Sequence, residues 1–399
     1  MGSKTNLLCC AASLMLCPAL LASAARLPET RPIPVLAWSG IPQAQTTEAR
    51  YRELADCGFT IDFSSFSNVA KTTEALDVAA KAGVQILISC PELSSDPQGA
   101  AKLLMTHPAL AGYFIGDEPK VADFQAQATW IEKIRSVDKT HLVYVNLLPD
   151  YGTPDQFGAP TYQEYVDRFV ATVPTDFLSF DYYPIVGNSV RPSWYSNLGV
   201  IADAARKANK PFWAFALSLR HFAYPTATMQ NLREQVYSDL TYGAQGIQYF
   251  TYWQPGFDSA DSPIDAKGNR TAVYDRVKQM NAEIRAISPV FLGSRVQSLG
   301  HTGATLPPGT TRYVPSSPIK SLKTEGLGAI VSILANGTHR YLVIVNRDIE
   351  RPMPSTVEFD ASTHPLHVAK DGTLDEINAS SRPISVDPGD TLIFTWASL

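Results

Sequence analysis

Two adjacent carboxyl groups give the clearest chemical signal in the sequence. Asp117 ends the apolar segment 111–117, and Glu118 and Pro119 follow it, where the proline stops a strand and fixes the turn. A like charge beside Glu118 is expected to raise its pKa, as a general acid requires. In an ordinary strand-to-helix loop, the same side chains would cap the next helix. We interpret Glu118 as the candidate general acid/base and Asp117 as an assisting carboxylate.

A third carboxyl group is predicted at the end of another apolar segment. Asp181 lies in the segment 177–183, where we expect it to act as nucleophile or general base; a structural Asp bonded to backbone or Arg is the alternative. Alternation places Ser179, Asp181 and Tyr183 on one face, which favours Tyr183 over Tyr182 as a binding residue. The predicted substrate-binding residues are Trp38, Glu92, Asn146, Tyr183 and Trp253. The alternatives are a solvated loop for the glutamate and core packing for the aromatic residues.

This set of residues fits sugar chemistry. Cleavage of a glycosidic bond needs a carboxylic acid that protonates the leaving oxygen as the bond breaks. A second carboxylate, or a neighbouring group on the substrate, must then meet the oxocarbenium-like centre. Amide and carboxylate side chains can bind the hydroxyl groups, and aromatic faces can stack on the sugar rings.

The elements that carry these residues are predicted to form a (β/α)8 TIM barrel. From residue 33 onward, a strand-then-helix alternation repeats eight times over about 255 residues, the usual size of this fold. Because such barrels place their functional residues at the carboxyl ends of the strands, the candidates above should meet at one rim. The expected strands are 35–40, 59–65, 84–91, 111–117, 142–148, 177–183, 212–219 and 247–253. The expected helices are 47–57, 72–82, 97–106, 122–137, 162–173, 194–208, 229–242 and 272–287, with Gly58 and Gly83 just past two helix ends.

The pattern of predicted secondary structure changes near Pro289. The segments 329–334, 341–346, 356–359, 366–370 and 391–396 are strand-like, and turn residues such as Asn336-Gly337 separate them. Asn-Gly between alternating apolar runs is a strong hairpin signal. We therefore predict a barrel over 25–290 and a C-terminal antiparallel β-sandwich over 291–399.

The first 24 residues have the pattern of a secretory signal peptide. One lysine precedes the apolar stretch 7–21, and small residues stand before the expected cleavage point after Ala24 or Ala25. Lipoprotein anchoring through Cys17 is less favoured, because Met15-Leu16 lacks the usual small residue. A secreted or periplasmic protein is expected, with only Cys57 and Cys90 left as two buried free thiols or one bridge.

Composition and missing motifs exclude several classes. The 399 residues carry 33 basic and 38 acidic side chains, a balance that argues against nucleic-acid binding. No later stretch is long and apolar enough to span a membrane. The sequence has no HExxH, P-loop or helix-opening GxGxxG motif, so we predict no cofactor and no metal. Asp258, Asp261 and Asp265 lack the calcium-loop spacing, and we expect them in a solvated loop.

The motif Gly112-Tyr-Phe-Ile-Gly-Asp-Glu-Pro119 resembles the strand-four motif of (β/α)8-barrel glycoside hydrolases, in which the acid/base Glu precedes Pro. The large retaining clan has Asn-Glu-Pro there, so Asp117 replaces the Asn. The segment 243–250 resembles the last strand of family 42 β-galactosidase-like barrels. The Asp-Glu pair is similar to that of families 20 and 123, in which the N-acetyl group of the substrate is the nucleophile. This resemblance implies that Glu118 is the acid and that Asp117 orients the acetamido group.

One departure from the retaining pattern keeps other functions open. The clan carries its nucleophile Glu at the end of strand seven, but the segment 215–221 has no carboxylate. A non-catalytic glycan-binding barrel is therefore the alternative to an enzyme that hydrolyses O-glycosidic bonds of oligo- or polysaccharides. A lyase is a third hypothesis, for which Tyr183 and His221 would have to converge. A carbohydrate is the expected partner, and the sequence leaves the oligomeric state open.

Overall fold

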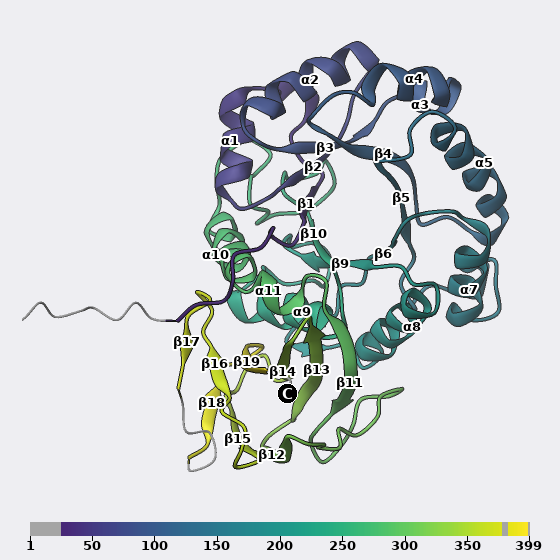
Figure 1. Ribbon diagram of the computed structural model, residues 1–399. Coiled ribbons are helices and arrows are strands. Elements are labelled where there is room, and N and C mark those ends of the chain that lie inside the picture. The colour runs from purple at the N-terminus through teal and green to yellow at the C-terminus, as the bar shows by residue number, and fades with distance from the viewer. Residues whose placement is uncertain (1–24, 377–381, 398–399) are drawn as a thin grey trace, which may run out of the picture.

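The computed structural model describes residues 25–376 and 382–397. The predicted signal peptide, residues 1–24, lies outside the described residues. Eight parallel strands form a closed barrel in the order β1-β10-β9-β6-β5-β4-β3-β2, and a smaller β domain lies at its side (Figure 1). The predicted fold class, a TIM barrel followed by an antiparallel β-sandwich, is therefore confirmed.

Apolar segments form the barrel strands, and their side chains alternate between two cores. Leu36, Trp38 and Phe63 belong to a cluster inside the barrel, whereas Val35 and Ala37 belong to the core between strands and helices. The strands are β1 (Val35–Trp38), β2 (Ile61–Ser65), β3 (Gln85–Ser89), β4 (Leu110–Asp117), β5 (Leu142–Leu147), β6 (Leu178–Phe180), β9 (Phe212–Leu217) and β10 (Gly246–Phe250).

Eight helices cover the outside of the barrel, as the sequence pattern predicts (Figure 1). Asn68 and Thr161 start two of them by accepting a backbone N–H bond from the first turn. The helices are α1 (Glu48–Asp56), α2 (Val69–Lys81), α4 (Pro97–Leu104), α5 (Phe124–Arg135), α7 (Tyr162–Thr172), α8 (Trp194–Lys207), α9 (Met229–Thr241) and α10 (Ala272–Ala286). Gly58 and Gly83 follow the ends of α1 and α2 with φ angles of 91° and 69°, which confirms their predicted role after a helix end.

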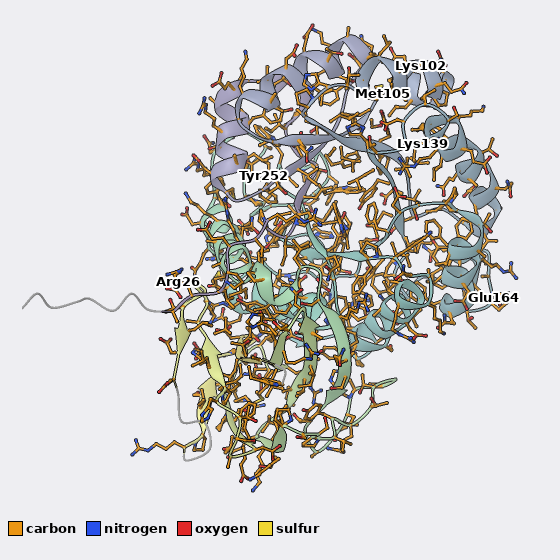
Figure 2. The ribbon with its side chains drawn as sticks, viewed as in Figure 1. Arg26, Lys102, Met105, Lys139, Glu164 and Tyr252 are labelled. Carbon is orange, nitrogen blue, oxygen red and sulfur yellow. The ribbon has the colours of Figure 1, made fainter. Side chains whose placement is uncertain are left out.

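Charged side chains lie on the outer surface of this helical layer. Figure 2 shows Lys102 and Glu164 on its outer side and Tyr252, which is 1% exposed, inside the molecule. No helix among the described residues has both the length and the apolar character needed to cross a membrane. Cys57 and Cys90 are buried free thiols, as expected.

Several short helices and strands lie in the segments that connect the main strands and helices. The expected strand 177–183 is wrong at its carboxyl end, because β6 stops at Phe180 and the chain turns toward Pro184, which lacks a backbone donor. Asp181 and Tyr183 therefore lie in a loop rather than on a strand. The short elements are η1 (Gln43–Gln45), α3 (Glu92–Ser95), η2 (Val121–Asp123), α6 (Pro154–Phe157), the hairpin β7 (Ile185–Val186) and β8 (Ser189–Val190), and α11 (Ser288–Phe291).

The C-terminal domain consists of a six-stranded and a three-stranded antiparallel sheet. The Asn336-Gly337 turn joins β13 to β14 as a hairpin, in agreement with the sequence signal. The larger sheet has the order β11 (Arg295–His301), β13 (Ala329–Asn336), β14 (His339–Asn346), β19 (Thr391–Ala397), β16 (Leu366–Val368) and β17 (Leu374–Asp375). The smaller sheet has the order β12 (Ile319–Thr324), β15 (Met353–Phe359) and β18 (Ile384–Val386).

The two domains pack directly on each other, since α9 and α11 of the barrel contact strands β13 and β14 (Figure 1). Arg233 of α9 binds Glu283 of α10 at 2.5 Å and Asp390 of the C-terminal domain at 3.0 Å. Lys370 also binds Asp390, at 2.6 Å. Of these ion pairs, Arg233–Asp390 crosses the domain boundary, and its largely buried side chains help to fix how the domains sit together.

Candidate active site

A cavity of about 370 Å³ opens at the carboxyl ends of the barrel strands. It is bounded by residues from the ends of β1, β4, β5, β9 and β10 and from the loops that follow β6, β9 and β10. Parallel closure of the barrel brings these ends to one rim, although they are far apart in the sequence. The lining residues are Trp38, Asp117, Glu118, Asn146, Asp181, Tyr183, Phe215, His221, Phe222, Phe250 and Phe257.

Asn146 holds two carboxyl groups of this cavity together. Its Nδ2 donates to Asp117 Oδ1 at 3.1 Å and to Asp181 Oδ1 at 2.9 Å. Because both oxygens lie about 3 Å from one nitrogen atom, they cannot be more than about 6 Å apart. The amide uses one hydrogen for each carboxyl group, so its own orientation sets theirs.

A buried polar chain inside the barrel fixes the orientation of Asn146. Its Oδ1 accepts a hydrogen bond from Ser179 Oγ at 2.9 Å. The Ser179 hydroxyl lies 2.7 Å from Tyr144 OH and accepts from Gln248 Nε2 at 2.9 Å, and Tyr144 OH donates to Gln248 Oε1. Residues from β5, β6 and β10 thus determine which end of the amide faces the carboxyl groups.

Glu118 stands at the point where β4 leaves the barrel. Its φ angle is 47°, a left-handed conformation that is uncommon for a residue with a side chain. Its backbone N–H donates to the carbonyl of Asn146 at 2.9 Å, and its carboxyl group forms a hydrogen bond with that of Asp181. Two carboxyl groups can share a hydrogen bond only if one of them is protonated. The local backbone therefore directs Glu118 toward Asp181.

All three carboxyl groups have raised pKa values. For Glu118, desolvation raises the pKa most, repulsion from Asp117 raises it further, and the bond with Asp181 opposes both. For Asp117, desolvation raises the pKa and the bond from Asn146 lowers it. For Asp181, desolvation, then Glu118 and then Asp117 raise the pKa well above its usual range. The cluster can therefore keep a proton at pH values where an isolated carboxyl group has lost it.

Aromatic side chains form the remaining walls. Trp38 contacts Phe63 and Phe215 with ring centroids 4.4 Å and 5.3 Å apart, and Tyr183 stacks on Phe250 at 5.7 Å. Within the described residues that line this cavity, the carboxyl groups all belong to the one cluster held by Asn146 and Glu118. The opposite walls thus offer faces and edges of rings rather than a second acid.

The cavity brings together six of the eight residues predicted as functional, namely Trp38, Asp117, Glu118, Asn146, Asp181 and Tyr183. Glu92 and Trp253 do not line it. Glu92 lies in α3, where it accepts a hydrogen bond from Val69 N at 3.2 Å and so caps α2. Trp253 is buried in the outer core, with the Arg50 guanidinium 5.1 Å above its ring.

Four phenylalanines and one histidine of the cavity were not predicted as site residues. Phe215 on β9 and Phe250 on β10 occupy positions whose side chains face the inside of the barrel by strand alternation. That alternation is a sequence signal that could have identified both residues. The loop residues Phe222 and Phe257 have no such signal. His221, named from the sequence only for the lyase hypothesis, is 8% exposed, because rings such as Tyr224 at 4.8 Å surround it. That burial lowers its pKa.

Two acids of the loop that follows β10 bind other loop residues: Asp261 links this loop to the one after β9, and Asp265 organises its own loop. Asp261 pairs with Arg220 at 3.3 Å, and Asp265 accepts backbone bonds from Lys267 and Asn269. Over the described part of the chain, no group of three His, Cys, Asp or Glu side chains is arranged to hold a metal ion.

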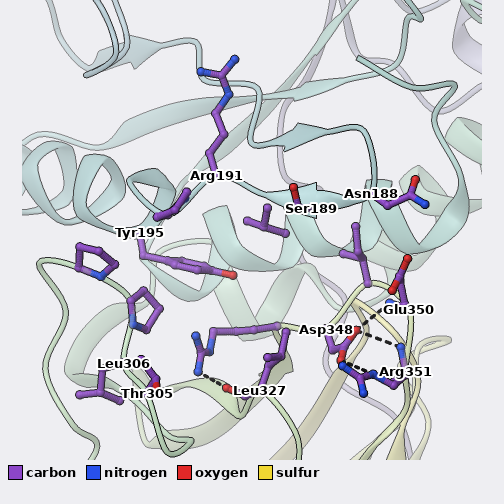
Figure 3. A pocket seen from close by; sticks show the side chains of 16 residues that line it. Asn188, Ser189, Arg191, Tyr195, Thr305, Leu306, Leu327, Asp348, Glu350 and Arg351 are labelled. Carbon is purple, nitrogen blue, oxygen red and sulfur yellow. Dashed lines mark hydrogen bonds and ion pairs between the residues drawn. The ribbon is translucent and has the colours of Figure 1, made fainter. Parts of the chain in front are cut away.

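A second cavity, of about 410 Å³, lies between the β7–β8 hairpin and loops of the C-terminal domain (Figure 3). Asp348 accepts hydrogen bonds from Glu350 N at 2.9 Å and Arg351 Nε at 3.2 Å, and Arg347 donates to backbone carbonyls. Figure 3 shows Arg191 pointing away from this cavity, and its guanidinium donates to Tyr224 OH at 3.1 Å. Each of these bonds lies within one domain, and together they engage most of the charged side chains of the cavity lining internally.

The fold and the site define the chain as a (β/α)8-barrel protein with an acidic, ring-lined cavity at the catalytic face of the barrel. No protein-family model and no curated protein sequence matches it. Solved structures of similar fold include a glucosidase from Croceicoccus marinus, at 10% identity over 92% of this chain and 95% of that one, with a TM-score of 0.47. The Anoxybacillus α-amylase matches at 10% identity over 92% and 98%, with a TM-score of 0.48. The endo-α-mannosidase from Bacteroides thetaiotaomicron matches at 15% identity over 60% and 80%, with a TM-score of 0.43. These are similarities of fold at low sequence identity, and no single family is assigned.

Proposed function

We propose that this protein hydrolyses O-glycosidic bonds with Glu118 as the general acid/base. The observation that supports this most strongly is the cluster of three carboxyl groups with raised pKa values in a cavity whose other walls are aromatic. A protonated Glu118 can donate its proton to the leaving oxygen and afterwards, as a carboxylate, take a proton from the attacking water. The aromatic walls offer faces on which a sugar ring can stack.

The spacing within the cluster bears on the second catalytic group. Retaining enzymes with a carboxylate nucleophile hold the two carboxyl groups about 5–5.5 Å apart, and inverting enzymes hold them about 6.5–9.5 Å apart. Glu118 and Asp181 belong to one cluster of interacting carboxyl groups, so we infer that both would meet a bound sugar from the same side. A sugar held against this cluster would have rings rather than an acid on its other side.

We therefore propose that the nucleophile comes from the substrate, which would be an N-acetyl sugar. The acetamido oxygen would bond to the anomeric carbon while the bond from that carbon to the leaving oxygen breaks. The leaving oxygen would take the proton of Glu118. Water would then open the cyclic intermediate and return a proton to Glu118. Asp117, held by Asn146 beside the acid, would orient the acetamido N–H.

The test is hydrolysis of a panel of aryl glycosides, including N-acetylhexosaminides, by the wild type, Glu118→Gln and Glu92→Gln. We expect loss of kcat by about 10²–10⁴-fold for Glu118→Gln, since general acid catalysis contributes that much. Glu92→Gln is the matched control, because that side chain lies outside the cavity, and it should keep full activity. Unchanged activity of Glu118→Gln would refute the acid assignment. Activity on sugars that lack an acetamido group would refute the substrate-assisted mechanism but not the assignment of Glu118 as the acid.

Two other functions are distinguished by the same measurements. A non-catalytic glycan-binding barrel would bind oligosaccharides without turnover. A lyase would need Tyr183 and His221, whose rings are 6.5 Å apart in the cavity. Burial raises the pKa of the Tyr183 phenol well above 10, so it stays protonated at neutral pH, which disfavours its use as a base.

We also propose that the chain is exported and cleaved close to residue 24. In support, the segment directly after that point is part of the fold: Leu374 N donates to Ala25 O at 2.7 Å, and Leu27 N donates to Gly372 O at 2.9 Å. Mass spectrometry of the mature protein from the periplasm or medium tests this. An intact N-terminus, or retention in the cytoplasm, would contradict it.

A further inference from the structure

The loops that follow β9 and β10 are joined to each other at the rim of the cavity. Arg220 N donates to Ala260 O at 2.8 Å, and Ala260 N donates back to Arg220 O at 2.9 Å. Asp261 strengthens this link, because its carboxylate pairs with Arg220 at 3.3 Å and accepts from Thr226 Oγ1 at 2.6 Å. The two loops therefore form one braced unit beside the carboxyl cluster.

Two phenylalanines of this unit, Phe222 and Phe257, and Phe250 at the end of β10 have rings in nearly parallel planes. Phe250 and Phe257 have ring centroids 6.4 Å apart and planes 8° apart, and Phe257 and Phe222 have values of 6.5 Å and 5°. Exposure rises outward, from the half-buried Phe250 to Phe257 at 42% and Phe222 at 88%. All three line the cavity, so this aromatic strip leads from the carboxyl cluster into solvent.

Phe222, at the outer end of the strip, has an unfavourable backbone conformation. Phe222 has a φ angle of 46°, and the left-handed conformation costs about 1–2 kcal/mol for a residue with a side chain. An 88% exposed ring gains almost nothing from burial in return. Asp261, which braces the loop, also has a positive φ angle, of 57°. Strained backbone that persists in this way is concentrated at ligand-binding sites.

We propose that the aromatic strip binds the sugar unit next to the one whose glycosidic bond is broken. The substrate would then be an oligosaccharide or longer chain, whose second ring lays its apolar C–H face on Phe257 and Phe222. The exposed Arg220 and Asp261 flank the strip and can bind the hydroxyl groups at the ring edge. This inference rests on the proposed glycosidase function and adds that a second sugar unit is recognised.

The size of the strip favours a sugar over a protein partner. Aromatic side chains bury about 150–250 Å² each at most, so two exposed rings cover far less than the roughly 1,200–2,000 Å² of a stable protein interface. The strip is also continuous with the cavity that holds Glu118, which a sugar chain could span without a break.

The test compares Phe222→Ala and Phe222→Trp with Leu103→Ala, a matched control because Leu103 is 70% exposed but lies on α4. For Phe222→Ala we expect kcat/KM to fall about 5- to 10-fold on an N-acetyl-sugar oligosaccharide and to stay unchanged on the corresponding methyl glycoside, since stacking is worth about 1 kcal/mol. Phe222→Trp should retain the activity, and Leu103→Ala should match the wild type. Equal loss on both substrates, or no loss on the oligosaccharide, would overturn the proposal.

Direct binding separates this inference from the proposed function. If no substrate is turned over, titration of the wild type and Phe222→Ala with the oligosaccharide, followed by tryptophan fluorescence, decides the matter. Weaker binding by Phe222→Ala would uphold the strip and refute only the hydrolase. Equal binding, or no binding by either protein, would overturn the strip. Concentration-dependent self-association that Phe222→Ala abolishes, measured by sedimentation, would instead assign the strip to contacts between copies of the chain.

Discussion

Asn146→Ala should change the pH dependence of the reaction, because Asn146 stabilises the ionised forms of two carboxyl groups. Its Nδ2 bonds Asp117 at 3.1 Å and Asp181 at 2.9 Å, and both bonds lower the pKa of the acceptor. A hydrogen bond to a charged group contributes about 1.5–3 kcal/mol. Because the cavity is open to solvent and water can replace part of each bond, we expect a rise of about one pKa unit, or about 1.4 kcal/mol.

The direction of the shift in the pH profile follows from the protonation state that each carboxyl group must have in the reaction. In the proposed reaction Asp117 acts as a carboxylate, so activity falls on the acid side as Asp117 gains a proton. Loss of the Asn146 donor disfavours the carboxylate, so the acid limb of kcat/KM should move to higher pH by about one unit. The alkaline limb, which reports loss of the Glu118 proton, should not move upward, because protonation of its neighbours removes repulsion.

The assay is a pH profile of kcat/KM for Asn146→Ala, with Asn188→Ala as the control. Asn188 is an exposed asparagine in the β7–β8 hairpin turn and does not line the cavity that holds Glu118, so its removal should leave the profile unchanged. An acid limb of Asn146→Ala at the wild-type pH, or at lower pH, would refute the argument that this amide controls the carboxyl cluster.

Two further predictions concern stability. Burial raises the pKa of Asp62 to about 7, so the contribution of this group to the free energy of unfolding is fully present below about pH 4 and falls by up to about 4 kcal/mol as the pH rises through 7. Asp62→Asn should remove this loss in denaturant titrations at pH 4 and pH 8, and an equal pH dependence in both proteins would contradict the burial argument. Arg233→Ala should cost about 3 kcal/mol, the lower end of the range for breaking a buried ion pair, because Glu283 loses its cationic partner whereas Asp390 keeps Lys370. A change below about 1 kcal/mol, the size expected for an exposed ion pair, would contradict the assignment.

The order of strands and helices is determined largely by local sequence. Helix ends at Gly58 and Gly83, the Asn336-Gly337 hairpin and the apolar periods are set by residues near each other in the chain. Once those units form a barrel, residues at strand ends such as Trp38, Asp117 and Asn146 must meet at one rim. That is why the sequence alone could predict most of the carboxyl cluster.

For residues that follow the end of a strand, only the tertiary structure decided the direction of the side chain. Glu92 and Trp253 follow their strands as the site residues do, yet one caps α2 and the other packs under Arg50, because each connecting segment turns toward the helical layer. Phe222 and Phe257 meet only because the pairing of Arg220 with Ala260 joins two loops that are distant in sequence. Strand periodicity fixes a side chain's face for as long as the strand lasts, and past that point the direction depends on contacts that no local pattern encodes.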